Sequence, residues 1–128
     1  MEAEGKPGDA SALFQQAWAE ATTDLEKFTA AHYVARQQKK VADKLAWDET
    51  ALQFALQIED DSMKAHYPSL YLNIAKCWED LYDTANALKN YRLALSFADF
   101  LQDDRYGNMI KSGIAKGIER VSRLQFRH

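Results

Sequence analysis

The chain has 128 residues, of which 47% are hydrophobic and 27% charged, with only two prolines and five glycines. This composition fits one folded domain and excludes a largely disordered chain. The net charge of −3 excludes the strongly basic domain of a typical nucleic-acid binder, and the single cysteine, Cys77, excludes an internal disulfide and a cysteine-based metal cluster.

The first part of the chain predicts a disordered polar tail over residues 1–8, followed by helix. Residues 1–8 are polar and turn-forming, and Asp9 after Pro7-Gly8 is a good N-cap. Apolar residues then recur at three- and four-residue steps without glycine or proline, which favours one long helix over 9–38. The capping-box pattern Thr23-x-x-Glu26 leaves open a division into two helices.

Helices are also predicted along the rest of the chain, over residues 42–59, 68–82, 84–102 and about 105–125. Pro68 suits the first turn of the second of these segments. Gly113 and Gly117 in the last helix predict a close helix–helix approach. No segment alternates with a period of two, so no strand is expected.

One segment occurs twice. Residues 51–61 read ALQFALQIEDD and residues 94–104 read ALSFADFLQDD, 43 positions later. Self-similarity at such a period is typical of stacked helical repeats.

Residues 68–95 resemble a tetratricopeptide repeat, and the spacing of 43 is similar to the long-period variant of that family. The family's aromatic, aliphatic and small positions are matched by Tyr71, Ile74, Ala75, Trp78, Ala87, Tyr91 and Ala94. Tyr82 departs from the pattern, because the family usually has glycine there.

The resemblance implies an all-α fold of stacked helical hairpins. It would be a single domain over 9–128, with a degenerate repeat at about 24–60, a strong repeat at about 67–104 and a capping helix at about 105–125. It also implies a non-catalytic adaptor that holds a peptide or protein segment in a concave groove, and no cofactor.

Side chains turned away from the paired helix are the candidate groove residues. They are Tyr33, Arg36, Asn73, Lys76, Lys116, Glu119 and Arg123. Such a set could bind a peptide backbone and its carboxylates, so an acidic or C-terminal segment is the expected partner. Asn73 and Lys116 match the family's carboxylate-clamp positions, whereas Thr29 and Tyr33 do not.

His32 and Asp48 occupy positions where the better repeat has Ala75 and Tyr91, so a polar pair inside the first hairpin is predicted. The structural interpretation is favoured, since buried polar groups generally find partners. Two alternatives to the adaptor remain: a regulatory sensor that binds a small ligand or peptide, and an enzyme that uses His32, Asp48 and Arg36. No spacing of histidines suggests a metal site.

Two surfaces remain. The last helix carries a basic stripe of Lys116, Arg120, Arg123 and Arg127. The net negative charge of the whole domain argues against a nucleic-acid site there. A homodimer contact could form on the first helix through Leu13, Phe14 and Trp18.

No apolar run approaches the roughly 20 residues that span a bilayer, and the acidic start is not a signal peptide. A cytoplasmic location is therefore expected.

Overall fold

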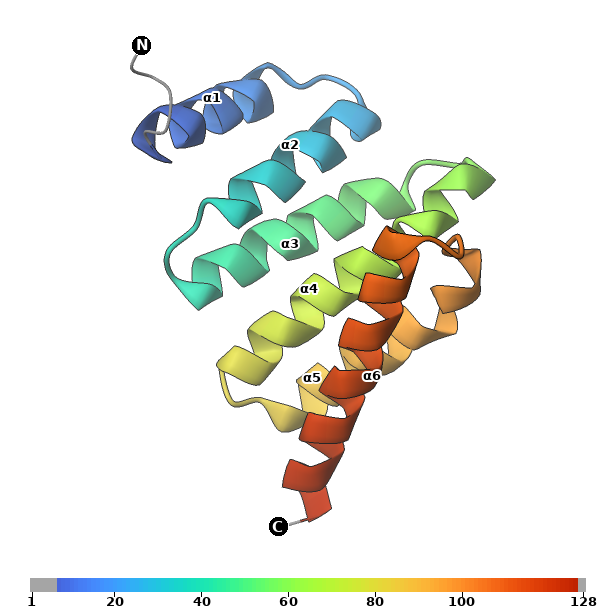
Figure 1. Cartoon of the computed structure of the whole chain (residues 1–128). Coiled ribbons are helices and arrows are strands. Elements are labelled where there is room, and N and C mark those ends of the chain that lie inside the picture. Colours follow the sequence, from blue (N-terminus) through green and yellow to red (C-terminus); the bar gives the residue numbers. More distant parts are fainter. Residues whose placement is uncertain (1–6, 127–128) are drawn as a thin grey trace. The chain divides into compact units, whose positions relative to one another are not determined.

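The computed structural model describes residues 7–126 and is all-helical, with six α-helices and two short 3₁₀ helices in this range (Figure 1). The chain divides into two compact units, Met1–Ile58 and Glu59–His128. The boundary falls between the two predicted repeats. The expected single domain and the stacking of the repeats stay predictions.

The first unit contains α1 (Pro7–Glu20), α2 (Asp24–Arg36) and α3 (Val41–Leu56). The predicted single helix over 9–38 is therefore wrong. The chain breaks after Glu20 because Thr23 caps α2, its hydroxyl accepting from the backbone N–H of Glu26 while the Glu26 carboxylate accepts from the backbone N–H of Thr23. The predicted tail also ends early, since Pro7 and Gly8 are already helical; residues 1–6 lie outside the described range.

Small residues let the helices of the first hairpin approach closely. Ala31 and Ala35 of α2 and Ala51 and Ala55 of α3 are completely buried, and these two helices form an antiparallel pair (Figure 1). The remaining helix, α1, is attached through Trp18, whose ring meets the rings of Trp47 and Phe54 edge-on at centroid distances of 5.2 and 5.8 Å.

The second unit contains η1 (Asp61–Ala65), α4 (Tyr67–Asp80), α5 (Thr84–Ser96), η2 (Ala98–Phe100) and α6 (Arg105–Phe126). Pro68 lies in the first turn of α4, as predicted. The helix predicted over 84–102 is shorter than expected. It ends at Ser96, whose hydroxyl bonds back to the carbonyl of Leu93, and the next residue, Phe97, packs its ring against Tyr67 and Tyr71 of α4.

Tyr82, the residue that departs from the repeat pattern, has a left-handed backbone with φ of 63°. It follows α4 in a Schellman motif, in which the backbone N–H of Tyr82 bonds to the carbonyl of Glu79 and that of Asp83 to the carbonyl of Trp78. Asp83 then caps α5 by accepting from the backbone N–H of Asn86 at 3.0 Å. The turn between α4 and α5 is thus held on both sides.

The last helix, α6, packs against α4 and α5 in the second unit (Figure 1). Gly117 is buried against the ring of Tyr91, and a Cβ at this position would lie only 2.3 Å from that ring. At Gly113 a Cβ would make only an ordinary contact with Leu72, at 3.4 Å, so the close approach is required at Gly117. The close helix approach predicted from the two glycines is confirmed at Gly117.

The helix starts reproduce the sequence period. α2 and α4 begin 43 residues apart, at Asp24 and Tyr67, and so do α3 and α5, at Val41 and Thr84. The two hairpins therefore share one design, although α3 extends to Leu56 while α5 ends three residues before the equivalent position.

Candidate protein-binding site

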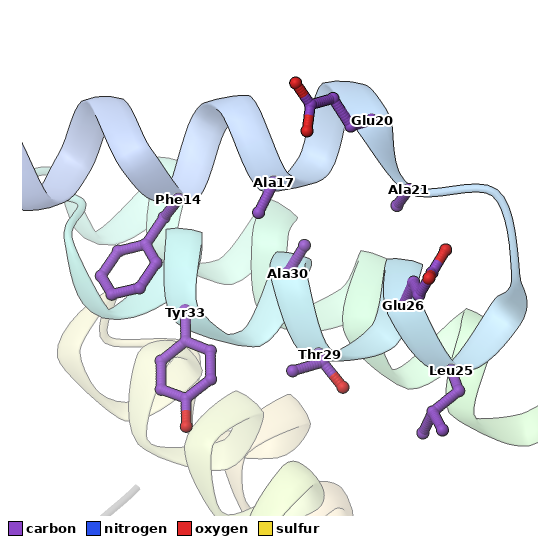
Figure 2. A pocket seen from close by; sticks show the side chains of 9 residues that line it. All are labelled: Phe14, Ala17, Glu20, Ala21, Leu25, Glu26, Thr29, Ala30 and Tyr33. Carbon is purple, nitrogen blue, oxygen red and sulfur yellow. The ribbon is translucent and has the colours of Figure 1, made fainter.

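An open trough of about 610 Å³ runs between α1 and α2 in the first unit. Figure 2 shows the two helices side by side, with Phe14 and Tyr33 at one end and Glu26 near the connection at the other. Three alanines also line the trough: Ala17 from α1, Ala21 from the start of the α1–α2 connection, and the buried Ala30 from α2.

The walls of the trough are apolar and accessible. Phe14 stacks on Tyr33 with ring centroids 5.2 Å apart, which fixes the aromatic end. Leu25 and Tyr33 remain 57% and 47% exposed although both are large apolar side chains. Single exposed apolar side chains are common on protein surfaces, so the trough is a candidate docking site because Leu25, Tyr33 and Phe14 line one concavity together.

The end of the trough near the α1–α2 connection is acidic. One oxygen of Glu26, Oε1, accepts from the backbone N–H groups of Thr22 and Thr23 and from the Thr22 hydroxyl. These backbone hydrogen bonds hold the pKa of Glu26 below its usual value, so the carboxylate is ionised at neutral pH. Glu20 lines the same trough and accepts from Gln16 through Oε2. Among the described residues that line this trough there is no lysine or arginine.

The structure places the predicted groove residues in both units. Tyr33 and Arg36 lie on α2, Asn73 and Lys76 on α4, and the other three, Lys116, Glu119 and Arg123, on α6. Within the second unit, α4 and α6 are in contact, so that part of the predicted set is carried by neighbouring helices. That all seven line one groove stays a prediction.

The cations of this set are largely occupied by carboxylates. Arg36 binds Asp48, Lys76 lies 3.4 Å from Asp80, and Arg123 lies 3.3 Å from Glu119. These contacts weaken the argument for an acidic partner, which relied on free positive charge.

Asp48 is buried, and Arg36 Nη2 donates to both of its oxygens at 2.5 and 2.6 Å. The predicted pair of His32 with Asp48 stays a prediction. The ring of His32 meets the ring of Tyr33 at a centroid distance of 5.4 Å. Arg36 and Asp48, two members of the proposed catalytic cluster, thus form an ion pair within the first hairpin.

Sequence reasoning missed a matching bridge in the second hairpin. Tyr91 donates its hydroxyl hydrogen to Glu79 at 2.6 Å, and Arg120 of α6 donates to the same carboxylate at 2.8 and 3.0 Å. Glu79 and Tyr91 lie 43 residues after Arg36 and Asp48. Comparing polar residues 43 positions apart would have found both bridges. Each joins residues 12 apart, but the donor lies on the first helix in one hairpin (Arg36) and on the second helix in the other (Tyr91).

The basic stripe and the predicted dimer contact have side chains that are already engaged within their own unit. In the basic stripe, Arg120 is bound to Glu79 and Arg123 to Glu119, while Arg127 lies outside the described residues. In the predicted dimer contact, Phe14 and Trp18 make aromatic contacts inside the first unit, and Leu13 is 64% exposed. Both surfaces stay predictions with fewer free side chains than expected.

Within residues 7–126, no helix combines the length and apolarity that crossing a membrane requires. Comparisons with family models, with curated proteins and with solved structures found no match to this chain. The functional argument therefore rests on the residues and their geometry.

Proposed function

We propose that this chain is a non-catalytic adaptor that binds a segment of another protein. The observation that carries the proposal is the open apolar trough between α1 and α2, on whose wall Tyr33, one of the predicted groove residues, is half exposed. The tetratricopeptide-type stacking of the two hairpins is part of the proposal. Its support is the shared period of 43 residues in the helix starts and in the polar bridges.

A protein segment suits the trough better than a small ligand does. Ligand pockets usually enclose most of the ligand surface, whereas this trough has exposed walls at Leu25 and Tyr33. An extended chain or a helix can lie along such a trough and still be solvated on its outer side.

An enzyme is a weaker interpretation of the same unit. The Asp48 side chain is only 2% exposed and both its oxygens are engaged by Arg36. A carboxylate in this state is poorly placed to act on a substrate, whereas it is well placed to join α2 to α3.

The test is affinity capture from an extract of the source organism, read by mass spectrometry. Wild type is compared with Tyr33→Ala and with the control Tyr106→Ala, which removes a tyrosine of similar exposure, 52% against 47%, from α6. We expect a partner that Tyr33→Ala loses and Tyr106→Ala retains. Identical protein lists for all three proteins would contradict the proposal. The variant Asn73→Ala/Lys76→Glu, run in parallel, shows whether the α4 face contributes.

A further inference from the structure

We infer that the trough between α1 and α2 docks a protein segment that places an apolar side chain beside a lysine or arginine. This inference rests on the proposed adaptor function and specifies its site and the chemistry of its partner. The apolar group would lie over the alanines and against the Phe14–Tyr33 stack, and the cation would meet Glu20 and Glu26.

The apolar half of the inference follows from how α1 is held. The ring of Trp18 contacts α3, while α1 packs mainly along α2, toward which Ala17 and, just after the helix, Ala21 point (Figure 2). The lining between the two helices is mostly apolar and open to solvent, with Leu25 and Tyr33 about half exposed. An apolar side chain that docks there removes the apolar surface that it covers from water, which stabilises the complex by roughly 25 cal/mol per Å².

The charged half follows from the unused oxygens of the two carboxylates. Glu26 uses Oε1 for the capping box and Glu20 uses Oε2 for Gln16, so each has a second oxygen with no hydrogen bond in the described structure. The capping box also fixes the Glu26 side chain, so little side-chain entropy is lost when a cation binds. With two carboxylates and no basic group among the described lining residues, a basic segment is favoured over an acidic one.

The chain's own basic helix is not the expected occupant. Although residues 105–124 carry five lysines and arginines against Glu119, the apolar residues Ile110, Ile114 and Val121 of α6 are buried in the second unit. The three core residues of α6 are therefore not available to the trough, whereas Met109 and Leu124 of the same helix are 60% and 42% exposed. A segment of a different protein is the proposed occupant, and a second copy of this chain is the alternative that the experiment must exclude.

The experiment selects binders from a displayed library of random short peptides on the full chain. The variant Ala17→Leu fills the trough, and Ala19→Leu makes the same change at an exposed α1 position outside the lining. Both substitutions keep good helix formers, and circular dichroism confirms that both variants fold. We expect peptides enriched in an aliphatic or aromatic residue near Lys or Arg, bound by wild type and Ala19→Leu and lost by Ala17→Leu.

A charge variant tests the acidic end. Glu20→Lys should weaken the selected peptides about fivefold, as expected for an accessible ion pair replaced by a repulsive one. Glu59→Lys, an exposed change outside the trough, should leave their affinity unchanged.

The failures are distinguishable. If wild type selects no peptide, the proposed adaptor function fails together with the inference. If peptides are selected but Ala17→Leu binds them as well as wild type does, the adaptor function survives and the trough is the wrong site. Enrichment of acidic or uncharged peptides would contradict the inferred contact between a lysine or arginine of the partner and the two carboxylates. Dimerisation of wild type in sedimentation analysis that Ala17→Leu abolishes would show a second copy as the occupant and overturn the inference.

Discussion

At the scale of single residues, the Arg36–Asp48 bridge illustrates how a buried charge depends on its partner. The Asp48 side chain is 2% exposed, while that of Arg36 is 33% exposed and supplies both hydrogen bonds. Removing one partner of such a pair leaves a buried charge without compensation, which costs more than the pair itself contributes. The effect of each substitution therefore depends on whether the other partner remains.

We expect Arg36→Ala to lower the free energy of unfolding by about 2–4 kcal/mol, because Asp48 stays buried and charged. Arg36→Ala combined with Asp48→Asn should recover a large part of this loss, since the amide carries no charge. Urea denaturation of the two single variants and the double variant measures the coupling. The control Lys76→Ala removes an exposed ion pair and should cost less than about 1 kcal/mol. Additive losses in the double variant would show that Asp48 does not depend on Arg36.

At the scale of the helices, α6 is fixed to its neighbours by one close glycine–tyrosine contact and one cluster of hydrogen-bonded polar side chains. Gly117 gives room for the ring of Tyr91, and the hydroxyl of the same tyrosine bonds to Glu79, which also binds Arg120. The hydrogen bonds from Arg120 are the main reason that the pKa of Glu79 lies below its usual value. A group whose pKa is lowered by folding stabilises the folded state above its unfolded pKa, and the effect is lost as the pH falls through its folded pKa.

Arg120→Ala should therefore destabilise the protein at pH 6, by about 1–2 kcal/mol, because the Arg120 side chain is 45% exposed and water screens the pair. Near pH 3 the difference from wild type should be smaller than at pH 6, because pH 3 lies below the ordinary glutamate pKa and so within the range in which this stabilisation is being lost. Arg123→Ala is the matched control, because its pair with Glu119 is exposed on both sides and should contribute little at either pH. An Arg120→Ala effect that is equal at both pH values would exclude the ion pair as its source.

Local signals predicted the helices better than the site. Pro68 acts within one turn of chain, so the start of α4 follows from the sequence. The Thr23–Glu26 box leaves two helices open as an alternative, but the favoured single helix over 9–38 is wrong, because the absence of glycine and proline carries less weight than the box. The left-handed backbone of Tyr82 was not predicted, although the family usually has glycine there.

The trough was not predictable, because it depends on where Trp18 anchors α1 and on which alanines then face α2. The sequence places Tyr33 on α2, but it does not show that α1 packs beside it. The trough that Tyr33 lines could therefore be seen only in the structure.

At the scale of the whole molecule, the distribution of charge bears on how a basic segment would be attracted. Residues 1–104 carry 18 acidic and 10 basic side chains, and the excess of basic groups is confined to residues 105–128. Of the basic groups in α6, Arg120 and Arg123 are already paired with carboxylates. The chain thus presents net negative charge to a basic partner, which favours a faster encounter at low salt.

Peptides selected for the trough should accordingly lose about threefold to tenfold in affinity between low salt and about 0.5 M NaCl, because salt screens exposed charges but leaves the apolar contact intact. Fluorescence anisotropy across a salt series measures this dependence. Glu20→Gln should flatten the salt dependence while retaining the binding measured at high salt, since it removes one carboxylate and leaves the alanine-lined surface unchanged. If affinity is equally strong at all salt concentrations, the docking contact is purely apolar and the two carboxylates have no part in choosing the partner.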